Sequence, residues 1–176
     1  GIALAVVTFA SLVDLARRLF ESHHEEMIEL VADYEAFCDT AGLLPQDLWT
    51  VFVPPCGSSF LHNISERLYY CPAERAIRRT RYLGIYAEKT VQAIGVISRV
   101  LDRPSIDLRT RTVRPSEGDT LTVDEQERIV RACEAAAQLD WPIEEGHRFY
   151  LCDEMAMTDF RKRTAGGIQN RRYLNL

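Results

Sequence analysis

The stretch Arg81–Val100 most constrains what this chain can fold into. Apolar and polar residues alternate along it twice, on either side of the short polar break Glu88-Lys89. Alternating runs of β-branched and aromatic residues around a short polar tip are typical of a β-hairpin. We therefore predict that a hairpin forms here and begins a small sheet in the second half of the chain.

The first third of the chain has the pattern of an α/β protein. Ile2–Phe9 is a continuous apolar run that predicts a buried strand, and Trp49–Val53 predicts a second one. Residues at helical spacing between them predict a helix capped by Ser11, either continuous or broken near His23-His24. Together these elements predict a β-α-β unit with parallel strands and a right-handed crossover.

Later segments alternate between strand and helix patterns. Thr122 and Glu125 have the spacing of a capping box, so we predict a helix over residues 122–139. The other segments predict a short helix capped by Ser58 or Ser59, a connector at 69–80, an exposed edge strand at Asp102–Arg114, a strand at His147–Met157, a basic loop at Thr158–Asn170 and a last strand at Tyr173–Leu176.

The predicted fold class is therefore α+β. A β-α-β layer within an α/β subdomain at residues 1–72 is expected to pack on a β-rich subdomain at residues 73–176. We expect the second subdomain to be a mixed or antiparallel sheet, or a small barrel, crossed by one helix.

Charge is distributed in blocks along the chain, although the net charge is only −5. Residues 74–114 and 161–176 are basic, whereas residues 1–73 and 115–160 are acidic. The overall balance argues against a protein coated in basic charge, but the blocks allow a polarised surface or pairing of opposite charges between copies of the chain. A homo-oligomer is therefore one prediction.

The cysteines and the apolar segments bear on location. Five cysteines are scattered without a C-x-x-C pair, which predicts reduced, mostly buried thiols in a cytoplasmic protein and no zinc knuckle. The opening apolar run is too short to span a bilayer and has no basic segment before it, so we predict no membrane segment. The chain begins with Gly1, which leaves open whether further residues precede it.

One turn has the residues of an anion site. Cys56, Gly57, Ser58 and Ser59 follow a predicted strand and begin a predicted helix, where backbone N–H groups can hold an anion or stabilise a thiolate. The alternative is a capped helix start with a half-buried thiol. His62 and Asn63 nearby are residue types of cysteine hydrolases, but residues so close in sequence are rarely placed as a triad.

Two catalytic classes lack their motifs. His23-His24 has no second ligand one helical turn away, so we predict a solvated helix face and no metal site. A metal-dependent nuclease with a PD-(D/E)xK motif needs an acid two residues before a lysine. Ala87 and Phe160 occupy those positions before Lys89 and Lys162, and we expect no cofactor.

Two arginine-rich clusters are the strongest candidates for a binding surface. Basic loops that contain glycine let the backbone approach phosphates closely. Nearby tyrosines could stack on bases: Tyr69, Tyr70, Tyr82, Tyr86 and Tyr173. The alternative is solubilising charge on loops. The predicted nucleic-acid contacts are Arg75, Arg78, Arg79, Arg81, Arg161, Lys162, Arg163, Arg171 and Arg172.

The hairpin sequence RYLGIYAEKTVQAIGVI resembles the first strands of PUA-like small barrels, the superfamily that includes ASCH and EVE domains. The strand HRFYLCDEM and the tail TDFRKRTAGGIQNRRYLNL extend this resemblance over residues 80–176. It implies a β-barrel that binds RNA or modified DNA, although the Gly-x-Lys-x-x-Glu-x-Arg signature of ASCH domains is absent. The segment VVTFASLVDLARRL is similar to the later β-α-β part of restriction-type nuclease folds, over residues 1–70.

The sequence thus predicts a nucleic-acid-binding module for DNA or RNA, as part of a defence or restriction system. One alternative is a fragment of a nuclease or hydrolase whose catalytic residues lie upstream of Gly1 or at the Cys56 turn. The other is a structural or assembly protein.

Overall fold

The predicted hairpin at Arg81–Val100 is present. In the computed structural model, β3 (Tyr82–Ala87) and β4 (Thr90–Asp102) pair antiparallel and are joined by Glu88 and Lys89. Both turn residues have positive φ, +52° and +62°, as in the two-residue turns whose twist matches that of the strands. The second strand continues two residues beyond the predicted hairpin.

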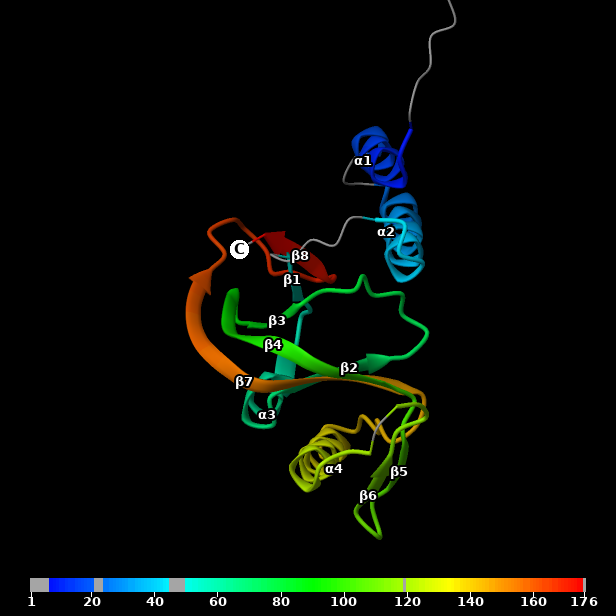
Figure 1. Cartoon of the computed structure of the whole chain (residues 1–176). Helices are drawn as coiled ribbons and strands as arrows, with labels where there is room; N and C mark the ends of the chain where they lie inside the picture. Colours follow the sequence, from blue (N-terminus) through cyan, green and yellow to red (C-terminus); the bar gives the residue numbers. More distant parts are fainter. Residues whose placement is uncertain (1–6, 21–23, 45–49, 119, 176) are drawn as a thin grey trace, which may run out of the picture. The chain divides into compact units, whose positions relative to one another are not determined.

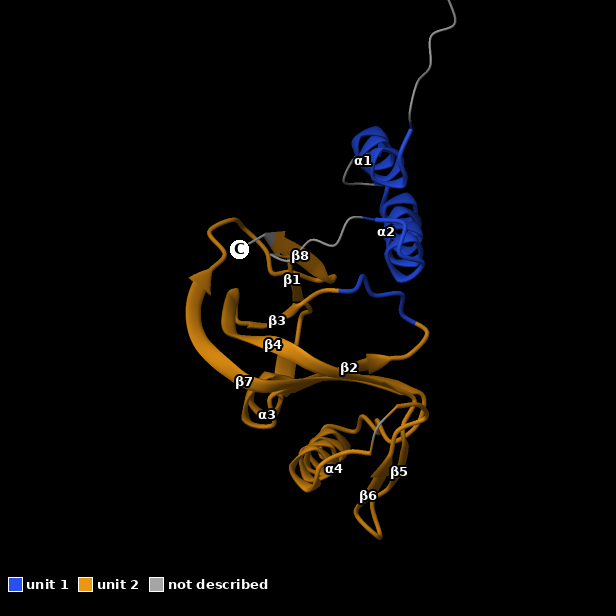
Figure 2. Ribbon diagram, in the orientation of Figure 1, with its two compact units in different colours: residues 1–48, 75–79 blue, residues 49–74, 80–176 orange. Residues whose placement is uncertain are grey.

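The structure describes residues 7–20, 24–44, 50–118 and 120–175. They fall into two compact units, shown in different colours in Figure 2. Unit 1 comprises residues 1–48 and 75–79, and unit 2 comprises residues 49–74 and 80–176. The predicted division into subdomains at residues 1–72 and 73–176 stays a prediction.

Unit 2 contains a curled six-stranded mixed sheet that forms half of a barrel (Figure 1). The strand order is β2-β7-β4-β3-β1-β8, in which only β1 and β3 run parallel. Besides β3 and β4, the strands are β1 (Thr50–Val53), β2 (Leu68–Pro72), β7 (His147–Arg161) and β8 (Arg172–Asn175).

One helix covers part of this sheet, as the sequence predicts. The α4 helix (Val123–Ala137) begins with the predicted capping box between Thr122 and Glu125. Its apolar residues form the larger core cluster together with side chains of β2, β4 and β7. The buried members from helix and sheet include Ile129, Val130, Cys133, Ala136, Leu68, Tyr70, Leu101, Phe149 and Leu151.

Two predictions for the middle of the chain are wrong. Residues 68–72 form β2 rather than a connector, because β7 supplies a strand to pair with. The predicted edge strand Asp102–Arg114 is instead a separate hairpin of β5 (Ser105–Asp107) and β6 (Thr112–Arg114). Its turn is fixed by the Asp107 carboxylate, which accepts hydrogen bonds from two turn N–H groups.

The short helix after β1 is present, but its serine cap is not. A 3-10 turn (Gly57–Ser59) leads into α3 (Phe60–Ser65), and Ser59 makes no capping hydrogen bond with its side chain. The Ser59 hydroxyl instead donates to the carbonyl of Cys56 at 2.6 Å. The side chain therefore stabilises the 3-10 turn rather than the helix start.

Unit 1 consists of two helices and a short segment from later in the chain. These helices are α1 (Phe9–Leu19) and α2 (Glu25–Thr40), so the predicted helix is broken. Thr8 caps α1 in a reciprocal pair of hydrogen bonds with Ser11, which is why residues 7–9 are not part of a strand as predicted. Residues 2–6 of that prediction lie outside the described residues.

The predicted β-α-β pairing is also wrong. Strand β1 has β3 on one side and β8 on the other, so both of its edges are occupied by strands that follow it in the chain. Trp49, the first residue of the predicted strand, lies outside the described residues.

A buried carboxylate joins the parts of unit 1. Glu35 on α2 is nearly inaccessible and accepts hydrogen bonds from the guanidinium groups of Arg17 and Arg78. The backbone N–H of Arg79 donates to the carboxylate of Asp39. Because a buried carboxylate needs compensating charge, these arginines stabilise the fold of unit 1.

The described residues thus make an α+β protein with four helices, the curled six-stranded sheet and one small hairpin. Among those helices, none is long and apolar enough to cross a membrane.

Candidate nucleic-acid interface

The basic segment near the end of the chain crosses one face of the sheet. It leaves β7, near one edge, and enters β8 at the other edge, so it passes over β4, β3 and β1. We call residues 162–171 the crossover loop. Ile168 packs against a cluster that contains Val53, Tyr86 and Val91, which fixes the face on which the loop lies.

Hydrogen bonds hold the crossover loop in place. The N–H of Lys162 donates to the carbonyl of Lys89 at 2.7 Å, and the N–H of Ile168 donates to the hydroxyl of Tyr86 at 3.1 Å. The ammonium of Lys162 donates to the carbonyls of Ala165 and Gly166, at 3.2 and 3.1 Å. Lys162, a predicted phosphate contact, therefore already has a role inside the loop.

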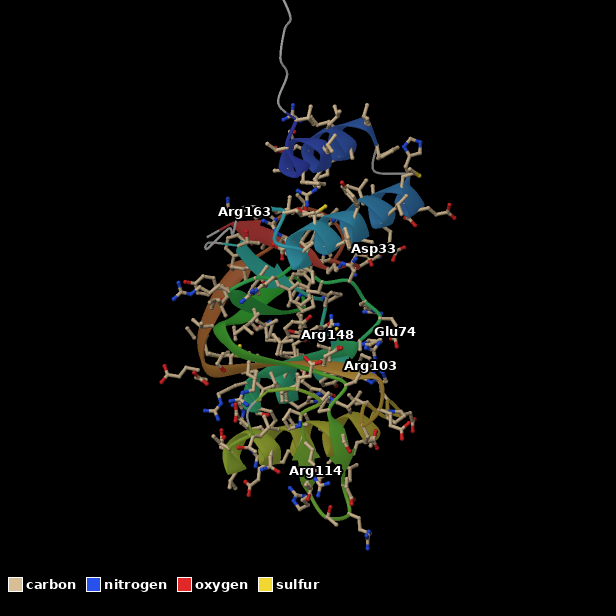
Figure 3. All side chains as sticks on the ribbon, turned by 45° about the vertical axis from the view of Figure 1, so that its right-hand side comes forward. Asp33, Glu74, Arg103, Arg114, Arg148 and Arg163 are labelled. Atoms are coloured by element: carbon tan, nitrogen blue, oxygen red, sulfur yellow. The ribbon has the colours of Figure 1, made fainter. Side chains whose placement is uncertain are left out.

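Three arginines at the ends of the crossover loop and on it are directed to solvent. Arg161, Arg163 and Arg172 are exposed, and over the described residues no ion pair involves any of them. Arg161 lies opposite Thr90, the residue after Lys89, at the tip of the β3–β4 hairpin, whereas Arg172 lies opposite Val53 on β1. Figure 3 shows Arg163 at the end of unit 2 that is remote from Arg114 on β6.

Other arginines of unit 2 are held by acids. Arg103 bonds Asp102 and lies near Glu74, and Arg148 also bonds Asp102, at 2.9 Å. Arg111 pairs with Glu134 on α4. The exposed arginines at the crossover loop differ from these in having no acidic partner among the described residues, a property that they share with Arg114 on β6.

The other predicted contacts are divided between the units. Arg75, Arg78 and Arg79 belong to unit 1, where Glu35 already binds Arg78. Arg81 belongs to unit 2, and its guanidinium lies 5.7 Å from the ring centroid of Tyr82. It stays a prediction that these arginines and those of the crossover loop bind nucleic acid together on one surface.

The Cys56 turn offers no ready thiolate. Cys56 is buried, its N–H donates to the carbonyl of Tyr86 at 2.8 Å, and its thiol lies 3.5 Å from the carbonyl of Pro54. Burial raises the pKa of this thiol to about 11. Since the thiolate is the nucleophile, Cys56 is inert at neutral pH. Gly57 and Ser58 are exposed, and Ser59 is buried.

A largely buried polar cluster lies beside this turn. The sequence draws attention to His62, Asn63 and Ser59, but not to the contact between His62 and Tyr70 on β2. His62 Nε2 lies 2.8 Å from the hydroxyl of Tyr70, and Asn63 Nδ2 lies 3.3 Å from that of Ser59. Burial raises the pKa of Tyr70 to about 12 and lowers the pKa of His62. The bond between His62 and Tyr70 anchors α3 to β2, and the bond between Asn63 and Ser59 joins α3 to the preceding 3-10 turn.

The described residues contain no group of three or more His, Cys, Asp or Glu side chains that could hold a metal ion.

Comparison of the chain with known proteins identifies no relative. No protein-family model, curated protein or solved structure matched it.

The aromatic residues are placed differently from what the sequence suggested. Of the tyrosines considered for stacking, Tyr69, Tyr70 and Tyr86 are buried, and Tyr82 and Tyr173 are half-buried. The exposed aromatic beside the basic residues is instead Phe160. The only signal for it in the sequence is its position inside the run DFRKR.

Proposed function

We propose that this chain is a nucleic-acid-binding module whose contact surface is the crossover loop with its flanking arginines. The observation that carries the proposal is the group of three exposed cations without acidic partners, Arg161, Arg163 and Arg172. Arginine binds phosphate in a planar, bidentate manner, and exposed unpaired arginines can do so without first breaking an ion pair. Net charge of the whole chain matters less than this local excess.

The finer fold assignment belongs to the same proposal. We propose that residues 80–176 are a divergent PUA-like barrel, which the curled sheet and the β3–β4 hairpin support. We also propose a role in restriction or defence, which rests on nucleic-acid binding alone. The nuclease resemblance of residues 1–70 does not support it, since β1 pairs with β3 and β8 rather than in a β-α-β unit.

The test measures binding of labelled 20-mer DNA and RNA by fluorescence anisotropy at two salt concentrations. Three phosphate contacts predict that affinity falls about 20- to 40-fold between 50 and 200 mM salt. The triple variant R161A/R163A/R172A should lose most of the binding and its dependence on salt. R114A is the matched control, because Arg114 is an exposed arginine at the other end of unit 2.

Two results would reject the proposal. One is no binding of DNA or RNA by micromolar wild-type protein at 50 mM salt. The other is a triple variant that binds like the wild type while circular dichroism shows both to be folded.

A second candidate function, self-association, is supported by unit 1. Phe9, Leu12 and Leu19 of α1 and Leu30 and Phe37 of α2 are exposed, and their spacing forms an apolar stripe on each helix. Apolar stripes of this kind mark interaction surfaces. We propose that they pack between copies of the chain.

Light scattering over a range of protein concentrations tests self-association. The apolar stripes predict a mass that rises with concentration, resists salt and falls in the variant L30E/F37E. Pairing of acidic and basic blocks predicts instead a mass that falls as salt rises. A wild-type protein that is monomeric throughout rules out both.

A further inference from the structure

One large apolar side chain lies beside the crossover loop without cover. Phe160 is in β7 and is 65% exposed, although it is a large aromatic residue. Its strand neighbours Asp159 and Arg161 direct their side chains to the opposite face, and Lys162 begins the crossover loop two residues later. Buried or half-buried tyrosines elsewhere in unit 2 show that aromatic rings in this sheet are usually covered.

Strand register fixes the face on which Phe160 lies. It is paired with Val91 on β4, and residues directly opposite each other in a sheet direct their side chains to the same face. Val91 packs in the cluster with Tyr86 and Ile168. Phe160 is therefore on the face that the crossover loop covers, at the margin that the loop leaves open.

Arg172 projects from the same face at the other side of the sheet. It is paired with Val53 on β1, and Val53 belongs to the cluster with Tyr86. An extended ligand on this face would therefore meet an aromatic ring at β7, the crossover loop over the centre and a cation at β8. This order of groups suits a strand with alternating bases and phosphates.

We propose that the ligand of this surface is single-stranded nucleic acid and that Phe160 is the platform on which one of its bases stacks. The inference rests on the proposed nucleic-acid binding and goes beyond it by naming the strand state. In a duplex the bases are stacked on each other, so a duplex offers this surface phosphates alone. An unpaired base can place its face on the ring, and such stacking tolerates any base.

The experiment compares a 20-nucleotide single strand with a 20-base-pair duplex, each labelled, at one salt concentration. The wild type should bind the single strand more tightly. F160A should weaken single-strand binding by about 5- to 150-fold, the range expected for loss of one stacked base, and leave duplex binding unchanged. F160W should restore binding, with quenching of the introduced indole fluorescence by the single strand.

L61A is the matched control, because Leu61 is an apolar side chain, 68% exposed, on α3 rather than on β7. It should leave binding of both ligands unchanged. Circular dichroism and thermal melts establish that each variant is folded.

The outcomes separate this inference from the function on which it rests. Binding of neither ligand by the wild type overturns the proposed function itself. If both ligands bind and R161A/R163A/R172A weakens both, the function stands. In that case, an F160A variant that binds the single strand like the wild type, or that weakens both ligands equally, overturns the stacking platform.

Discussion

Arg128 and Arg163 show two uses of the same side chain within unit 2. The guanidinium of Arg128 on α4 is buried and donates to the carbonyls of Glu66, Arg67 and Cys152, each at 2.7 Å. Arg163 on the crossover loop is exposed and has no ion pair among the described residues. The donors of the first arginine bind backbone carbonyls and lie near Asp124, whereas those of the second bind no acid among the described residues.

The difference follows from backbone geometry rather than from charge. The three carbonyls come from the end of α3, the residue after it and a position on β7, and Arg67 has a φ of +51°. The carbonyl of Arg67 also accepts from the N–H of Cys152 on β7, whereas the carbonyl of Glu66 lies at the end of α3, where helix carbonyls lose their helical partners. One planar group with several donors satisfies them together.

Replacing Arg128 should have the largest effect and tests its side of the comparison. R128L removes three hydrogen bonds to backbone carbonyls, of which the carbonyl of Arg67 keeps another donor, the N–H of Cys152, and should lower the free energy of unfolding by about 3–5 kcal/mol. R128K keeps the charge but not the fork of donors, so a loss of about 1–3 kcal/mol is expected. Urea denaturation followed by circular dichroism measures both.

R131A is the control for that measurement. Arg131 is also on α4, but its pairs with Glu66 and Glu127 are at the surface, so its removal should cost only about 0–1 kcal/mol. Equal stability of R128L and R131A would show that Arg128 does not organise the backbone as described.

Alkaline pH should have the next largest effect, because it ionises buried groups of the fold and not the arginines of the loop. The pKa of Cys56 is raised by burial from 9.0 to about 11, and that of Tyr70 from 10.0 to about 12. Above pH 9 the unfolded thiol loses its proton while the folded thiol keeps it. The unfolded state then binds fewer protons, so stability falls as pH rises from about 9 to 12.

The free energy of unfolding at several pH values between 8 and 11 checks this sign. The C56A variant should show a shallower fall than the wild type over this range, because one of the shifted groups is gone. A stability that is constant or rises between pH 9 and 11 would contradict the burial of these groups. Thiol labelling in the native state should be slow at pH 8 and fast in urea.

Local signals in the sequence were enough for several elements. The β3–β4 hairpin and the capping box of α4 were predicted because a two-residue turn and an i, i+3 hydrogen-bond pair are encoded within a few residues. The helix at Phe9 carries the same kind of signal in Thr8 and Ser11, but the apolar run before it favoured a strand.

Elements that depend on distant partners could not be predicted in the same way. Strand β2 is a strand because β7, nearly eighty residues later, pairs with it, and the order of the sheet combines both halves of the chain. The basic residues of the interface were found from charge alone. That Tyr86 is buried under the loop while Phe160 is exposed depends on register and on the path of the loop.

The smallest expected effect separates Lys162 from Arg163, which are neighbours in sequence but differ in what they touch. The ammonium of Lys162 bonds two carbonyls of the crossover loop, whereas Arg163 has no ion pair among the described residues. K162M should therefore lower stability by less than about 1 kcal/mol, since these bonds are exposed, and should speed hydrogen exchange at Ile168. R163A should leave exchange unchanged and reduce the salt slope of single-strand binding by about 0.7, the value for one lost phosphate contact. If K162M lowered the salt slope as R163A does while exchange at Ile168 stayed slow, Lys162 would be a phosphate contact after all. Lys162 would then belong with Arg163 among the residues that bind the ligand, rather than among those that hold the crossover loop in place.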